Sequence, residues 1–79
     1  AIHLESIRDP AEVEAEWQKL VRKYPSLGRL PLRPALPVEV PGKGTFYRVA
    51  AGNFASRDEA ARACAPIKAA GAYCAILAP

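Results

Sequence analysis

The chain has 79 residues, of which 51% are hydrophobic and 24% charged. A chain of this length forms one compact domain with a thin core, which excludes a deep cleft between lobes. Its net charge of +3 suits an anionic polymer, nucleic acid or acidic glycan, but many ordinary domains carry as much. No apolar run approaches the roughly 20 residues that span a bilayer, and no signal-peptide pattern is present. Because strand-like residues stand at both ends, we expect a domain from a longer protein, with any anchor or export signal outside these residues.

The first half of the chain has the pattern of a strand followed by a helix. Residues 2–7 (IHLESI) alternate well enough for a half-buried strand. Asp9 stands at the N-cap position of the next element, with Pro10 in the first turn and Glu12 at the capping-box position. Pro25 and Gly28 end the helical pattern. The apolar stripe of this helix consists of Val13, Trp17, Leu20, Val21 and Tyr24.

The second half repeats the same order of elements. A strand over residues 46–51 (FYRVAA) leads through Gly-Asn-Phe to a helix whose capping box is Ser56 and Glu59. Gly71 ends this helix, and residues 73–77 (YCAIL) predict a last short strand. We interpret the chain as one domain, 1–79, made of two half-repeats, 1–28 and 45–79. The apolar stripe of the second helix consists of Ala60, Ala63, Cys64, Ile67 and Ala70.

A proline-rich segment joins the two halves. Its four prolines from position 31 to position 41 exclude a central strand, because each removes a ladder donor. Residues 36–40 (LPVEV) can still form an edge strand, and the following Pro-Gly-Lys-Gly predicts a turn. The element order is therefore βαββαβ, an α+β, ferredoxin-like fold. We expect a four-stranded antiparallel sheet with both helices on one face, the first and third strands central and the second at an edge.

The sheet face without helices is the place where a ligand can bind. Alternation along the two central strands turns His3 and Glu5, and Arg48 and Ala50, toward this face. The sequence has no Ser-His-Asp set, no paired carboxylates at a cleft and no phosphate-binding glycine loop. We therefore do not expect an enzyme, and we expect no cofactor.

The two cysteines, Cys64 and Cys74, do not have the spacing of a metal site, which needs closer pairs and further ligands. They can be two buried thiols, or a disulfide that stabilises a small extracytoplasmic domain. The sequence favours the disulfide slightly, and both alternatives stay open at this point.

The chain resembles a SPOR domain over essentially its whole length. Residues 47–54 (YRVAAGNF), the capped helix with Cys64, and residues 68–74 (KAAGAYC) resemble the second half of that family. Residues 2–7, with the helix that runs into residues 23–25 (KYP), resemble its first repeat. The chain departs from the family pattern at Ala50, where a polar or basic residue is frequent, at Glu5, which brings a negative charge, and at Ile7, which replaces an aromatic residue.

The resemblance implies non-catalytic binding of peptidoglycan glycan strands that lack stem peptides. Amidases that strip these strands at the division septum leave a free carboxylate on each muramic acid, and Arg48 can bind such a group. His3 stands where the family usually has Gln and could hydrogen-bond the sugars. The implied binding residues are His3, Glu5, Ser6, Arg48, Ala50 and Asn53.

The resemblance also implies a cellular setting. The parent protein would act in the periplasm at the septum, anchored to the inner membrane or exported, while this domain itself makes no membrane contact. A Cys64–Cys74 disulfide suits that compartment. We expect a monomer.

Two other functions compete with glycan binding. RNA-recognition motifs share the element order but carry aromatic residues on the central strands, and the outward positions identified above offer none. We therefore expect no nucleic acid partner. A protein-interaction module of an envelope or cell-division complex, using the edge strand or the proline-rich segment, remains the alternative.

Overall fold

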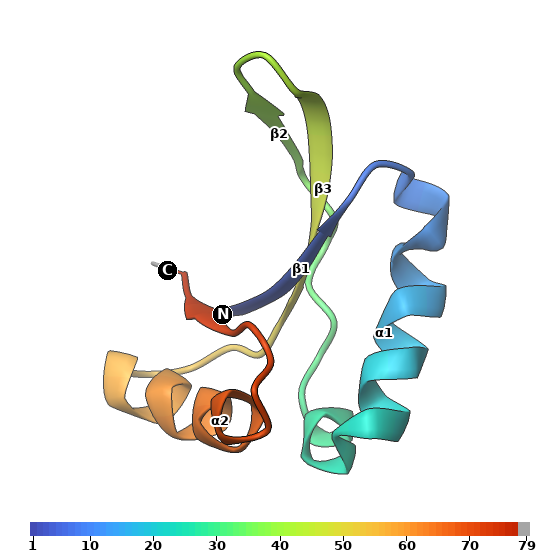
Figure 1. Ribbon diagram of the computed structural model, residues 1–79. Helices are drawn as coiled ribbons and strands as arrows, with labels where there is room; N and C mark the ends of the chain where they lie inside the picture. The colour runs from blue at the N-terminus through green and yellow to red at the C-terminus, as the bar shows by residue number, and fades with distance from the viewer. Residues whose placement is uncertain (78–79) are drawn as a thin grey trace.

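The computed structural model describes residues 1–77 and has the predicted α+β architecture (Figure 1). The strands are β1 (Ile2–Ile7), β2 (Pro37–Val40), β3 (Gly44–Ala51) and β4 (Ala75–Ile76), and the helices are α1 (Val13–Lys23) and α2 (Arg57–Ala69). They form one antiparallel sheet in the order β2-β3-β1-β4, so the first and third strands are central. β4 is shorter than the predicted 73–77. The last two residues of the predicted half-repeat 45–79 lie outside the described residues.

The helix ends follow the local sequence signals. Asp9 Oδ1 accepts a hydrogen bond from the Ala11 N–H at 2.9 Å, but the turn that it caps, Pro10–Glu12, is a 3-10 turn. The α-helix therefore begins only at Val13. At α2, Ser56 Oγ accepts from the Glu59 N–H at 3.2 Å, and the Glu59 carboxylate accepts from the Ala55 N–H at 3.1 Å.

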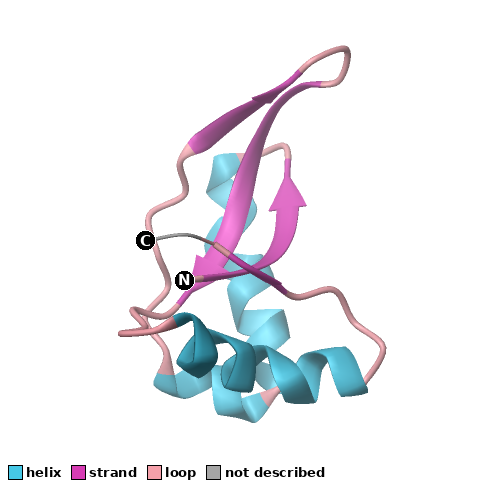
Figure 2. Cartoon of the chain, turned by 90° about the vertical axis from the view of Figure 1, so that its left-hand side faces the viewer, coloured by secondary structure: helices cyan, strands magenta, loops and turns pink. Residues whose placement is uncertain are grey.

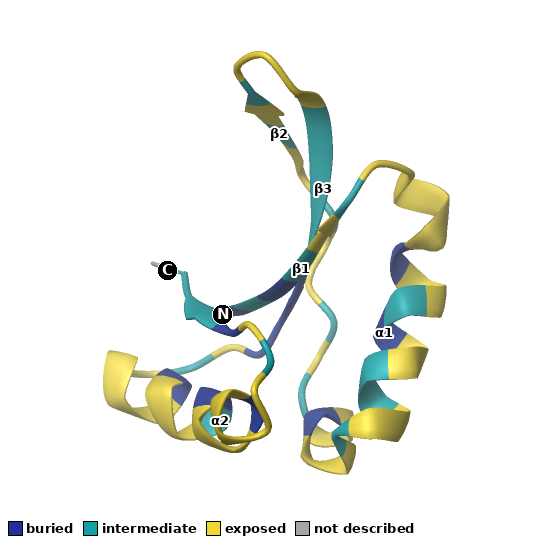
Figure 3. Cartoon of the chain, viewed as in Figure 1, coloured by how far each residue is buried: buried dark blue, intermediate teal, exposed yellow. Residues whose placement is uncertain are grey.

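Both helices pack on the same face of the sheet and enclose the core. Figure 3 shows the buried positions of α1 and α2 turned toward the strands and the exposed positions turned outward. The predicted stripes are buried or half-buried, except Ala70, which is exposed. The buried core residues from the sheet are Ile2, Leu4, Val49 and Ala51, and those from the helices and the turn after α1 are Val13, Trp17, Leu27, Ala60, Cys64 and Ile67.

A disulfide joins Cys64 and Cys74, as predicted. Their Cα atoms lie 5.6 Å apart, within the range that a disulfide spans without backbone movement. Both residues belong to the buried core. The bond therefore ties α2 to the segment that enters β4.

The proline-rich segment pairs with β3 over more residues than the sequence predicts. Before β2 begins, Leu32 forms an isolated bridge with Ala51. The Arg33 N–H donates to the Ala50 carbonyl at 2.8 Å, and the Gly52 N–H donates to the Pro31 carbonyl at 2.9 Å. These bonds hold residues 31–33 against the end of the same β3 edge that pairs with β2.

A bulge in β1 overturns one predicted orientation. His3 pairs with Ala50, but the next pair is Glu5 with Val49, so one residue of β1 is extra between them. Cross-strand partners share a face of the sheet, and Val49 is fully buried under the helices. Glu5 therefore lies on the helix-covered face, and its predicted place on the opposite face is wrong.

The surroundings of Glu5 agree with this position. Burial raises the pKa of the Glu5 carboxyl, and a hydrogen bond with Glu16 and repulsion by that carboxylate raise it further, while Lys19 opposes the shift. The same hydrogen bond, together with Lys19 at 3.2 Å, lowers the pKa of Glu16. Since Glu16 and Lys19 belong to α1, the Glu5 side chain is turned toward that helix.

Candidate functional site: a basic open face of the sheet

The sheet face that no helix covers, called the open face here, is seen from the front in Figure 2. The register past the bulge pairs Ser6 with Arg48, just as His3 pairs with Ala50 before it. Ser6 therefore occupies the open face itself, where the sequence predicts only a place at its border. The structure brings four of the six predicted site residues onto this face, places Asn53 in the loop at its edge, and turns Glu5 away.

His3 is held in one orientation by its neighbours. Its Nε2 lies 3.0 Å from the Glu5 carbonyl oxygen and 3.0 Å from Ser6 Oγ. Its Nδ1 lies 3.3 Å from the Tyr73 hydroxyl, and the two rings meet edge to face. Because a carbonyl oxygen can only accept, Nε2 carries the hydrogen, and in the neutral ring Nδ1 accepts from Tyr73.

The charge state of His3 follows from its surroundings. The pKa of the imidazole lies below its usual value, chiefly because the ring is partly buried. The hydrogen bond to the Glu5 carbonyl raises it, and the positive charge of Arg48 lowers it further. The neutral ring is thus favoured near neutral pH. On this face, the neutral His3 ring orients the Ser6 and Tyr73 hydroxyl groups, while Arg48 supplies the charge.

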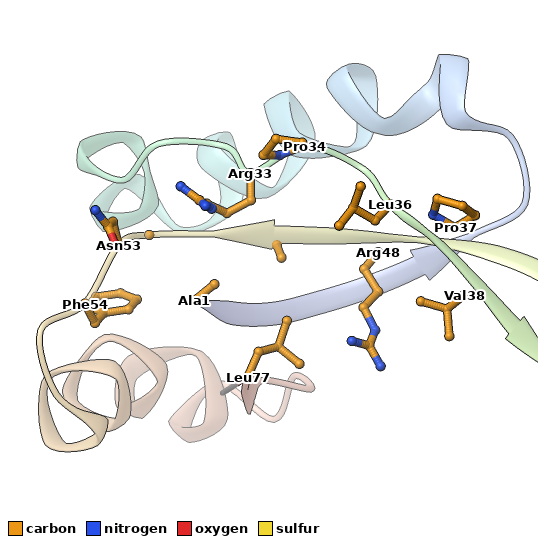
Figure 4. Close-up of a pocket in the computed structure, with 12 residues that line it drawn as sticks. Ala1, Arg33, Pro34, Leu36, Pro37, Val38, Arg48, Asn53, Phe54 and Leu77 are labelled. Carbon is orange, nitrogen blue, oxygen red and sulfur yellow. The ribbon is translucent and has the colours of Figure 1, made fainter. Parts of the chain in front are cut away.

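A pocket of about 600 Å³ lies on the open face beside these residues (Figure 4). Arg48 and the buried Ala50 of β3 form its floor. The proline-rich segment forms one side, and the loop after β3 and both ends of the described chain contribute the others. The remaining lining residues are Ala1, Arg33, Pro34, Leu36, Pro37, Val38, Gly52, Asn53, Phe54 and Leu77.

The open-face pocket combines positive charge with apolar walls. Arg33, Arg48 and Asn53 are its polar side chains, and no aspartate or glutamate is among the described residues that line it. Beyond the pocket, the Arg8 guanidinium lies 4.9 Å from the centre of the Phe46 ring and donates to the Lys43 carbonyl at 2.9 Å. Such a surface can bind an anionic ligand that also has apolar faces, as acidic saccharides have.

Sequence reasoning missed several residues of this site. Arg33 and Leu36 lie in a proline-rich segment, where alternation does not assign faces. Tyr73 was assigned to a strand but lies before β4, with its hydroxyl at His3. Phe46 lies two residues before Arg48 in β3 and therefore on the same face of the sheet. The alternation of side chains along this strand could have identified Phe46 as a residue of the open face.

The fold and this face define a two-layer α+β ligand-binding module with one sheet face left open. A family model described as the SPOR domain matches residues 1–78, and the chain therefore belongs to the SPOR domain family. Members of this family are peptidoglycan-binding modules of envelope cell-division proteins, and the family is a binding family rather than a catalytic one. The comparisons with curated proteins and with solved structures found no match. Neither helix within residues 1–77 is long and apolar enough to cross a membrane.

Proposed function

We propose that this domain binds peptidoglycan glycan strands from which the stem peptides have been removed, and that the open face is the binding surface. The observation that carries the proposal is Arg48, which stands on the floor of the open-face pocket with no acidic residue among the described lining residues. Removal of a stem peptide by an amidase leaves a lactyl carboxylate on the muramic residue. A guanidinium binds such a carboxylate through two parallel hydrogen bonds.

The rest of the open face suits the sugars between the carboxylates. Ser6 pairs with Arg48 across the two central strands, and its hydroxyl, held by His3 Nε2, can donate to sugar hydroxyl and acetamide groups. The apolar side chains of the pocket, such as Leu36 and Phe54, can pack against the C–H faces of sugar rings. Glu5 does not oppose an anionic strand, because the bulge turns it to the helix side.

The cellular role that follows is targeting. A monomeric domain that recognises stripped strands would bring its parent protein to the division septum, where amidases produce them. The Cys64–Cys74 disulfide supports a place in the periplasm, since disulfides persist in that compartment. The parent protein would be anchored to the inner membrane or exported.

The proposal is tested by replacing Arg48. Arg48→Gln is expected to lower the affinity for amidase-treated sacculi, measured by sedimentation, about tenfold. The substitution removes one charge-assisted, bidentate contact worth about 1.4 kcal/mol. The thermal midpoint should change little, because Arg48 has no carboxylate partner among the described residues.

The matched control is Arg22→Gln, which removes the same charge from the exposed side of α1. It should bind like the unaltered domain. Equal binding by both variants would mean that Arg48 does not contact the ligand.

A further inference from the structure

We infer that the open-face pocket recognises two carboxylates of one glycan strand, one at Arg48 and a second at Arg33. The inference rests on the function proposed above and goes further, because it names the charge pattern that the ligand must carry. A strand with two neighbouring stripped muramic residues satisfies both arginines. A strand with one isolated stripped residue satisfies only one of them.

Arg33 is held at the pocket by backbone bonds. Its N–H donates to the Ala50 carbonyl at 2.8 Å, directly beside the pocket floor. Pro31 accepts a hydrogen bond from the loop after β3, and Pro34 follows Arg33, so the backbone on both sides has restricted dihedral angles. The Arg33 side chain therefore extends from a fixed position on the pocket wall.

The two guanidinium groups stand apart along the pocket. The Arg33 backbone is hydrogen-bonded to Ala50, and Arg48 lies two residues before Ala50 in β3. The two backbone positions are therefore about 7 Å apart along the strand direction. Figure 4 shows Arg33 on the side of Asn53 and Arg48 on the side of Val38. One guanidinium in bidentate contact uses both oxygens of a carboxylate, so two separated guanidinium groups match two separate carboxylates.

The surroundings favour this occupant over an uncharged one. Within the described part of the chain neither arginine has a carboxylate partner, so both charges are available to a ligand. Leu36 lies on the pocket wall beside Arg48 (Figure 4) with 69% of its surface exposed, which is high for a large apolar residue. A sugar ring of the strand would cover Leu36 while the lactyl carboxylates of the muramic residues meet the arginines.

The test uses a tetrasaccharide of two stripped disaccharide units in three forms. In the first form both lactyl carboxylates are free, in the second one of them is converted to a methylamide, and in the third both are converted. Binding is measured by titration calorimetry for the unaltered domain, for Arg33→Gln, and for Arg22→Gln as the charge-matched control.

For the unaltered domain, we expect the first form to bind about fivefold more tightly than the second, the upper range for an exposed ion pair. Arg33→Gln should bind the first form about fivefold more weakly than the unaltered domain does, and it should bind the second form with unchanged affinity. Arg22→Gln should match the unaltered domain on every form. This set of results would support two separate carboxylate contacts.

Three other results would overturn the inference. If Arg33→Gln weakens both forms equally, the two arginines hold the same carboxylate. If Arg33→Gln changes neither affinity, Arg33 is not an anchor, while the proposed function stands on Arg48. If the unaltered domain binds the third form as tightly as the first, carboxylates are not recognised, and the proposed function fails together with the inference.

Discussion

Reduction of the Cys64–Cys74 disulfide is expected to lower the free energy of unfolding by about 2.7 kcal/mol. The bond closes a loop with a sequence separation of 10 residues, and the loop-closure entropy of the unfolded chain gives this magnitude. For a domain of this size the loss corresponds to a fall in the thermal midpoint of about 10–20 °C. The shift in the thermal midpoint is large because the unfolding entropy of so short a chain is small. Thermal unfolding followed by circular dichroism, with and without reductant, measures it.

The double variant Cys64→Ala, Cys74→Ala is the control for this prediction. It should melt near the temperature of the reduced domain and should not respond to reductant. Alanine is the suitable replacement because both cysteines are buried, and serine would bury a hydroxyl group without a partner. Two titratable thiols in the folded, unreduced protein would contradict the disulfide.

The second large effect is expected from Gly52→Ala, at the end of β3. Gly52 has a φ of +92°, and a Cβ atom there would lie 2.3 Å from Cε2 and 2.6 Å from Cζ of Phe54. The substitution strains the backbone and also displaces the half-buried Phe54 ring. We expect a loss of about 3 kcal/mol in the free energy of unfolding, measured by urea denaturation.

Gly42→Ala separates these two contributions. Gly42 lies in the turn between β2 and β3 with a φ of +77°, and a Cβ atom there would meet nothing within 4 Å. Gly42→Ala is therefore destabilised by backbone strain alone, which costs about 1 kcal/mol. Equal destabilisation by the two variants would mean that Phe54 is not held against Gly52.

Local sequence signals predicted the fold well because they act over a few residues. The caps at Asp9 and Ser56 and the apolar stripes of the helices need no knowledge of distant partners. Gly71 ends α2 as predicted, with a φ of +84° and the two reverse hydrogen bonds from Gly71 and Ala72 that close such helix ends. The chain order of these elements then limited the topologies to a few.

The candidate site was predicted less completely, because its geometry depends on pairing between distant segments. Alternation placed His3 and Arg48 on the open face but also placed Glu5 there. The bulge that reverses Glu5 appears only in the register of β1 against β3. Arg33 reaches the pocket through a backbone bond to Ala50, which nothing in the local proline-rich sequence indicates.

Recognition of stripped glycan is the central claim, and binding to two preparations of sacculi tests it most directly. One preparation is treated with an amidase that removes the stem peptides, and the other is left intact. The domain is sedimented with each at equal glycan content. We predict that the amidase-treated sacculi retain the domain and that the intact sacculi retain much less. Equal retention on both, or retention on neither, would contradict the account.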